Sequence, residues 1–183
     1  MKDTFRQYET AVKSCRDIFL KKTADYGSSW RVLRMISILD QIFIKAKRIR
    51  TIQEIGVRRV GEDITGEFQA IVNYGVIGLI QLDLNPDDPE DPGVEKTARL
   101  YDEKILFARK IMENKNHDYG EAWREMSQES FADLILMKLQ RMRQILANDG
   151  KTLISEGIDA NFTDIINYAI FALIGIAEGR HIA

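Results

Sequence analysis

The strongest constraint on the fold is that this 183-residue sequence repeats itself. A shift of 93 residues aligns the Asp-Tyr-Gly of residues 25–27 with that of residues 118–120, and Trp30 with Trp123. Towards the end of each half the shift becomes 94 and aligns Asn73-Tyr74 with Asn167-Tyr168. A repeat of this length predicts two copies of one structural unit that stack against each other.

The prolines mark the boundary between the two copies. All three lie in the segment LNPDDPEDPG, residues 84–93, with acidic residues between them. Proline at every third position favours an extended, polyproline-like spacer and excludes helix. We therefore expect a first repeat over residues 1–82, an acidic Pro-rich linker over 83–93 and a second repeat over 94–183, with both repeats packed as one globular unit.

The hydrophobic pattern predicts an all-α fold. Apolar residues follow helical spacing in each half, and Gly27 supplies a left-handed stop for the first helix. The third helix of each half is apolar nearly all round, so it should be central. We predict a six-helix bundle made of two tandem three-helix repeats with an internal pseudo-twofold axis. The expected helices run from about Tyr8 to Gly27, from Trp30 to Glu54, from Glu67 to the prolines, and over 94–116, 124–148 and 160–179.

Composition limits the functional classes. The single cysteine, Cys15, excludes an internal disulfide framework and fits a reducing compartment. We see no signal-type segment at the start and expect no membrane span, so we predict a soluble, cytoplasmic protein. The first repeat carries 14 Lys and Arg against nine Asp and Glu. This modest surplus suits small anions better than nucleic acid, which usually requires a clear basic stripe.

The second helix of each repeat carries an unusual lysine. Lys45 stands between the apolar face and a polar stripe that includes Arg48, and Lys138 stands in the same way beside Asp133 and Arg141. A half-buried ammonium loses hydration unless an anion or a carboxylate meets it. One interpretation is a phosphate site. The alternative is a lysine stem that caps the core beside Asp133.

The third helix of the second repeat offers a partner. Asp164, Asn167 and Tyr168 lie on one face of an otherwise apolar helix, and their oxygens suit a hard cation such as Mg²⁺. Glu129 and Asp133 would extend this acidic cluster; the alternatives are a solvated helix face and a polar network that sets helix register. The first repeat has Ala70 at the equivalent of Asp164, so we expect only the second repeat to hold a complete site.

A loop motif, KxxDYGxxW, occurs once in each repeat. Its aromatic residues could stack on a base while its lysine meets a phosphate, or the motif could be an aromatic-packed connector between helices. The residues concerned are Lys22, Asp25 and Trp30 in the first copy, and Lys115, Asp118, Tyr119 and Trp123 in the second.

These motifs resemble the small α-helical family called nucleotide modification associated domain, type 1. The resemblance covers essentially the whole chain as two copies and implies a role in nucleotide or base modification. A weaker architectural similarity is to MazG-like all-α NTP pyrophosphohydrolases, which hold magnesium with paired acidic residues; the spacing of Glu129/Asp133 and Asp164/Asn167 differs from theirs.

We therefore predict a nucleotide-binding protein, monomeric or homodimeric, and expect a Mg²⁺-dependent, phosphohydrolase-like activity. Asp133, Lys138 and Asp164 are the catalytic candidates, with Mg²⁺ held by Asp133, Asp164 and Glu129. The alternative is a non-catalytic helical interaction module in which the Lys and Asp residues form structural ion pairs. The predicted ligand-binding residues are Lys115, Asp118, Tyr119, Trp123, Arg141, Asn167 and Tyr168, with Lys22, Asp25, Trp30, Lys45 and Arg48 in the first repeat.

Overall fold

The computed structural model describes residues 3–56, 63–84, 87 and 90–183, and within them every regular element is helical. The all-α prediction is confirmed. The expected spacer conformation at Pro86 and Pro89 lies outside the described residues. The six main helices are α1 (Thr4–Tyr26), α2 (Met35–Ile55), α3 (Ile64–Asp83), α4 (Val94–Tyr119), α5 (Gln128–Ala147) and α6 (Ile158–Ala177).

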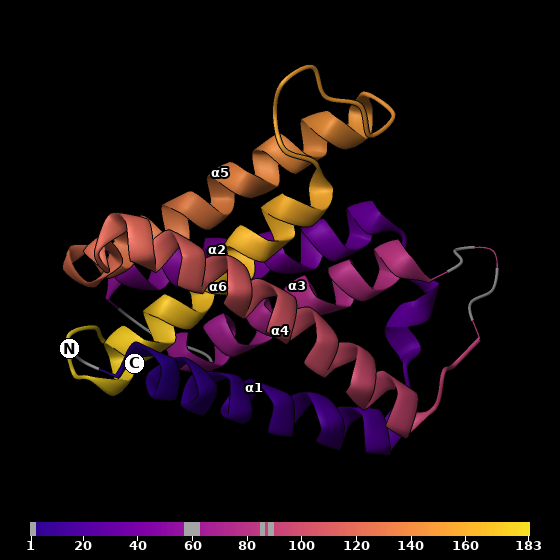
Figure 1. Ribbon diagram of the computed structural model, residues 1–183, viewed down its shortest axis with the longest axis horizontal. Helices are drawn as coiled ribbons and strands as arrows, with labels where there is room; N and C mark the ends of the chain where they lie inside the picture. The colour runs from indigo at the N-terminus through magenta and orange to yellow at the C-terminus, as the bar shows by residue number, and fades with distance from the viewer. Residues whose placement is uncertain (1–2, 57–62, 85–86, 88–89) are drawn as a thin grey trace.

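The helices form three layers (Figure 1). The middle layer is the pair α3 and α6; α2 and α5 pack together on one side of it, and α1 and α4 on the other. Most of α3 and α6 is buried, as their apolar composition predicts. Among the described helices, α6 alone has the length and apolar composition of a membrane span, and 78% of that apolar window is buried inside the bundle.

The second helix of each repeat begins later than the sequence pattern predicts. A short 3₁₀ helix comes first, η1 (Ser29–Val32) in the first repeat and η2 (Ala122–Glu125) in the second. Each contains a buried tryptophan, and the residue after each turn is extended, which breaks the helical path. The two tryptophans therefore anchor a corner between helices and are not the first residues of α2 and α5.

Buried hydrogen bonds link the two repeats reciprocally. The Tyr8 hydroxyl donates to Asn167 Oδ1 and the Tyr101 hydroxyl donates to Asn73 Oδ1, both at 2.8 Å. Each asparagine also donates its amide to a backbone carbonyl in the first helix of its own repeat; the acceptors are Cys15 for Asn73 and Ala108 for Asn167. The tyrosine hydroxyl and the asparagine oxygen of each repeat thus find their partner only in the other repeat.

Surface ion pairs between the repeats follow the same reciprocal scheme. Each pair has a counterpart in which the two repeats exchange roles, as a pseudo-twofold axis would produce. Such exposed pairs contribute little stability individually. The pairs are Arg16–Asp102 (2.6 Å) with Arg109–Glu9 (3.1 Å), and Arg143–Asp40 (2.8 Å) with Arg50–Asp133 (3.7 Å).

Candidate functional site

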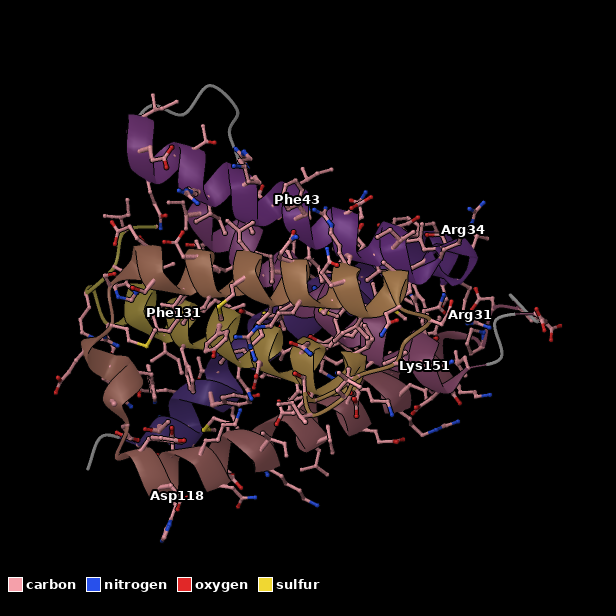
Figure 2. All side chains as sticks on the ribbon, turned by 90° about the horizontal axis from the view of Figure 1, so that it is seen from above. Arg31, Arg34, Phe43, Asp118, Phe131 and Lys151 are labelled. Atoms are coloured by element: carbon pink, nitrogen blue, oxygen red, sulfur yellow. The ribbon has the colours of Figure 1, made fainter. Side chains whose placement is uncertain are left out.

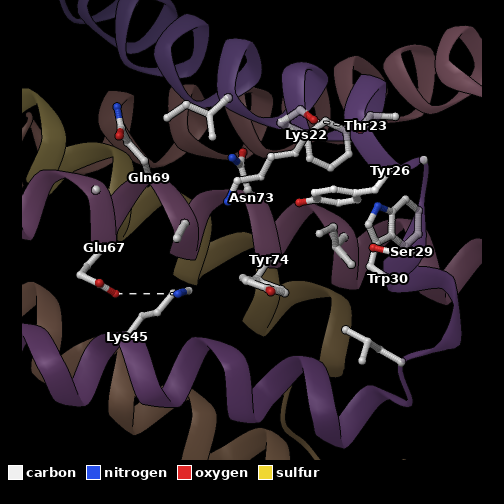
Figure 3. Close-up of a pocket in the computed structure, with 17 residues that line it drawn as sticks. Lys22, Thr23, Tyr26, Ser29, Trp30, Lys45, Glu67, Gln69, Asn73 and Tyr74 are labelled. Carbon is white, nitrogen blue, oxygen red and sulfur yellow. Dashed lines mark hydrogen bonds and ion pairs between the residues drawn. The ribbon is translucent and has the colours of Figure 1, made fainter. Parts of the chain in front are cut away.

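A cavity of about 380 Å³ opens in the first repeat, between the end of α1, the η1 turn, α2 and α3 (Figure 3). Ala70 forms part of its wall on α3, and the small side chain at this position leaves room between the helices. Its polar lining includes two lysines, one carboxylate and three aromatic side chains, which we call the first-repeat cavity residues. They are Lys22, Lys45, Glu67, Tyr26, Trp30 and Tyr74.

Lys45 reaches the cavity from α2 and is held there by a buried carboxylate. Its Nζ lies 3.9 Å from Glu67 Oε2 and 5.8 Å from the centre of the Tyr74 ring. The Glu67 side chain is only 5% exposed and also pairs with Arg48. Because Arg48 makes the closer contact with Glu67, the Lys45 ammonium retains capacity to bind a further anion in the cavity.

The aromatic side chains give the cavity flat apolar surfaces. Tyr26 and Tyr74 face the interior from α1 and α3, and Trp30 closes one end (Figure 3). Trp30 is 7% exposed, and its indole Nε1 has no hydrogen-bond partner within the described structure. Burial raises the pKa of the Tyr74 hydroxyl, with a smaller contribution from Tyr26. The cavity therefore offers aromatic rings on which a planar group can stack.

The second repeat brings its predicted charged residues together in a different way. Asp164 Oδ1 accepts a hydrogen bond from Lys115 Nζ at 2.7 Å, and Asp164 Oδ2 accepts one from Lys138 Nζ at 2.6 Å. The Asp164 and Lys138 side chains are each 9% exposed, whereas that of Lys115 is 50% exposed. We call these three residues the Lys115–Asp164–Lys138 cluster. Both oxygens of its carboxylate are occupied by lysines.

The predicted magnesium ligands do not converge. Asp133 lies on the surface beside Arg50, with its side chain 60% exposed, and Glu129 is also exposed. Asp164 instead directs both oxygens at lysines. Within the described residues there is no group of three His, Cys, Asp or Glu side chains suited to a metal ion. The interpretation of Lys138 as a cap beside Asp133 is corrected too, because its partner is Asp164.

The remaining predicted residues of the second repeat lie apart from the cluster or serve packing. Asp118 and Tyr119 are exposed at the end of α4, where Asp118 projects into solvent (Figure 2). Trp123 stacks on Phe171 with ring centres 4.2 Å apart, and Asn167 is committed to the buried contact with Tyr8. Two further residues keep accessible polar groups: Arg141 is exposed, and Tyr168 is half-buried, which raises the pKa of its hydroxyl.

Comparison with known protein families matches the chain to the family described as nucleotide modification associated domain 1. The family model matches residues 22–82 and again residues 115–176. The chain belongs to this family. Neither curated proteins nor solved structures gave a match. Each matched segment of the nucleotide modification associated domain begins at the lysine of the loop motif and extends through the third helix of its repeat, so each contains all the equivalent site positions.

Within this domain, the first repeat places Lys22 at the cavity but leaves Asp25 exposed and outside its lining. Sequence reasoning missed Glu67, whose buried carboxylate holds Lys45. A signal for it was present, since Glu67, Ala70 and Tyr74 stand at i, i+3 and i+7 on one face of an apolar helix. An acid at such a position requires a basic partner, and Lys45 and Arg48 are the lysine and arginine of the neighbouring helix that meet it.

Proposed function

We propose that this protein binds a nucleotide in the cavity of its first repeat. The observation that carries the proposal is the lining itself, which includes two lysines and the rings of Tyr26, Trp30 and Tyr74 around a hollow of about 380 Å³. That volume is within the range of small-molecule sites, which are mostly concave and carry a few polar groups. The family's description, a domain associated with nucleotide modification, agrees with a ligand of this class.

The lining of the cavity includes groups that suit both the phosphate and the base of a nucleotide. Lys22 and Lys45 supply ammonium groups for phosphate oxygens, and Lys45 is partly buried, where an ionic hydrogen bond is stronger than in water. Tyr26 and Tyr74 provide faces for stacking a base. The carboxylate of Glu67 orders the Lys45 side chain but leaves its ammonium group able to bind a further anion.

The lining supports binding of a nucleotide and not a reaction on it. A MazG-like pyrophosphohydrolase needs converging acidic pairs for magnesium, and Asp133 and Asp164 do not provide them here. The second repeat itself favours a structural role. Its cluster consists of direct ion pairs, which suit the alternative of a non-catalytic helical module, although Lys138 pairs with Asp164 and not with Asp133.

The test is a thermal-shift screen of ribo- and deoxynucleoside mono- and triphosphates, followed by titration calorimetry of the best ligand. Lys45→Met should weaken binding at least tenfold, because an ionic hydrogen bond contributes about 1.5–3 kcal/mol. The variant should stay folded, since Glu67 keeps Arg48 as a partner. Lys47→Met removes the same charge from an exposed position on α2 and is the matched control.

Two results would refute the proposal. One is a wild-type protein that no nucleotide stabilises at millimolar concentration. The other is a Lys45→Met variant that binds the nucleotide as tightly as the Lys47→Met control does, since this would place the ligand somewhere other than the first-repeat cavity.

A further inference from the structure

The two repeats carry lysines at equivalent positions, but the surroundings of these lysines differ. Lys22 and Lys45 of the first repeat correspond to Lys115 and Lys138 of the second. In the first repeat the two lysines line an open cavity. In the second they meet on the carboxylate of Asp164, at 2.7 and 2.6 Å.

We propose that the second repeat is an anion-binding site of the same kind, closed by its own carboxylate. Asp164 occupies the place that a phosphate group takes in the first repeat, so the chain binds one nucleotide although it contains two copies of the site. This inference rests on the proposed function for the identity of the ligand. The closing of the second site rests on the contacts of Asp164 alone.

The position of the acidic residue on the third helix of each repeat determines whether the two lysines of that repeat are free to bind an anion. In the first repeat the acid is Glu67, one turn before Ala70, where it pairs with Arg48 and leaves Lys45 at 3.9 Å. In the second repeat the equivalent of Glu67 is Asn161, whose side chain donates to a carbonyl of its own helix start at 2.7 Å. The acid there is Asp164, which stands where the first repeat has the small Ala70. The two acids thus differ in position by one helical turn. Glu67 orders one lysine, whereas Asp164 forms hydrogen bonds with two lysines.

An outside anion cannot readily displace Asp164. A carboxylate is similar to a phosphate group in charge sign and presents two oxygens to the two ammonium groups. It is tethered beside them, which gives it a high effective concentration. Displacing it would leave a charge that is 9% exposed without a partner, which is strongly unfavourable. Lys138 also borders a hollow of about 970 Å³ beside Arg141, but a phosphate can meet both ammonium groups of the cluster only when the carboxylate is removed.

The experiment measures binding stoichiometry with inorganic pyrophosphate, a probe that needs no knowledge of the base. We expect one site in the wild type and two in Asp164→Ala. Asp159→Ala, which removes the same charge from an exposed position on the same helix, should keep one site. Conversely, Ala70→Asp should weaken the first site by about 100-fold or more, whereas Ala70→Asn, with the same bulk and no charge, should weaken it less.

The outcomes separate this inference from the proposed function. A folded Asp164→Ala that gains no site while the wild type keeps one overturns the inference and leaves the function standing. A wild type that binds no nucleotide, together with an Asp164→Ala variant that gains a pyrophosphate site, removes the function and supports the inference. If Asp164→Ala does not fold, Ala70→Asp decides, and an unchanged affinity in that variant overturns the inference.

Discussion

Removing the three charges of the Lys115–Asp164–Lys138 cluster one at a time should destabilise the protein in a definite order. Asp164→Ala should be the most damaging, because it leaves Lys138 with a side chain only 9% exposed and no partner. Uncompensated buried charges of this kind cost about 3–5 kcal/mol. For a chain of this size that corresponds to a fall in melting temperature of roughly 6–20 °C.

The two lysines should matter less, and unequally. Lys138→Met removes a buried partner, but Asp164 keeps Lys115 at 2.7 Å, so the expected cost is about 1–2 kcal/mol. Lys115 is half exposed, and Lys115→Met should cost no more than about 1 kcal/mol. The double variant Lys138→Met/Asp164→Leu replaces the buried pair by hydrocarbon and should return close to wild-type stability.

Urea unfolding followed by circular dichroism measures all four free energies of unfolding, with an unchanged m-value as the check that the comparison is valid. The reasoning is refuted if Lys115→Met costs as much as Asp164→Ala, because the half-exposed lysine would then be the essential partner. It is also refuted if Asp164→Ala lies within 1 kcal/mol of wild type, since Lys138 would not then depend on this carboxylate.

Three further predictions concern the rest of the fold. Tyr101→Phe leaves the buried oxygen of Asn73 without its donor and should cost about 1–2 kcal/mol in the same unfolding assay; no change would mean that this contact does not hold the repeats together. Burial raises the pKa of the Cys15 thiol to about 12, so iodoacetamide at neutral pH should label it only after unfolding, as mass spectrometry would show; labelling of the folded protein contradicts the buried position. Backbone hydrogen bonds from Gly93 and Ser28 lower the pKa of Asp91, so its stabilising contacts are complete above the ordinary aspartate pKa and are lost as pH falls through the lowered value. The Ser28 amide should report that titration by NMR, and Asp91→Asn should abolish it.

Much of the fold follows from local pattern. Apolar periodicity and the 93-residue repeat were enough to predict six helices and the central position of the third helix in each repeat. The start of α2 was missed because Trp30 fits a helical pattern equally well, and only its burial in a tertiary corner determines the 3₁₀ turn. Such a choice depends on contacts between helices, which single-sequence periodicity does not contain.

The site was harder to predict than the fold. The two lysines at half-buried positions were found, and both do meet carboxylates. The choice between candidate acids could not be made, because only Asp133 shares a helix with Lys138. The distance from Lys138 to Asp164 depends on how α5 and α6 pack, which the sequence pattern does not contain. Ala70 was read as the loss of a ligand. In the structure its small side chain is part of the wall that leaves the cavity open.

The reciprocal hydrogen bonds of Tyr8 with Asn167 and of Tyr101 with Asn73 indicate that neither repeat should fold when it is expressed alone. A fragment expressed from either half would expose an apolar central helix and lack the group that satisfies its asparagine. Such a fragment should be insoluble alone and recover when its complement is co-expressed. A single copy could satisfy its asparagine in this way only by pairing with a second copy of itself.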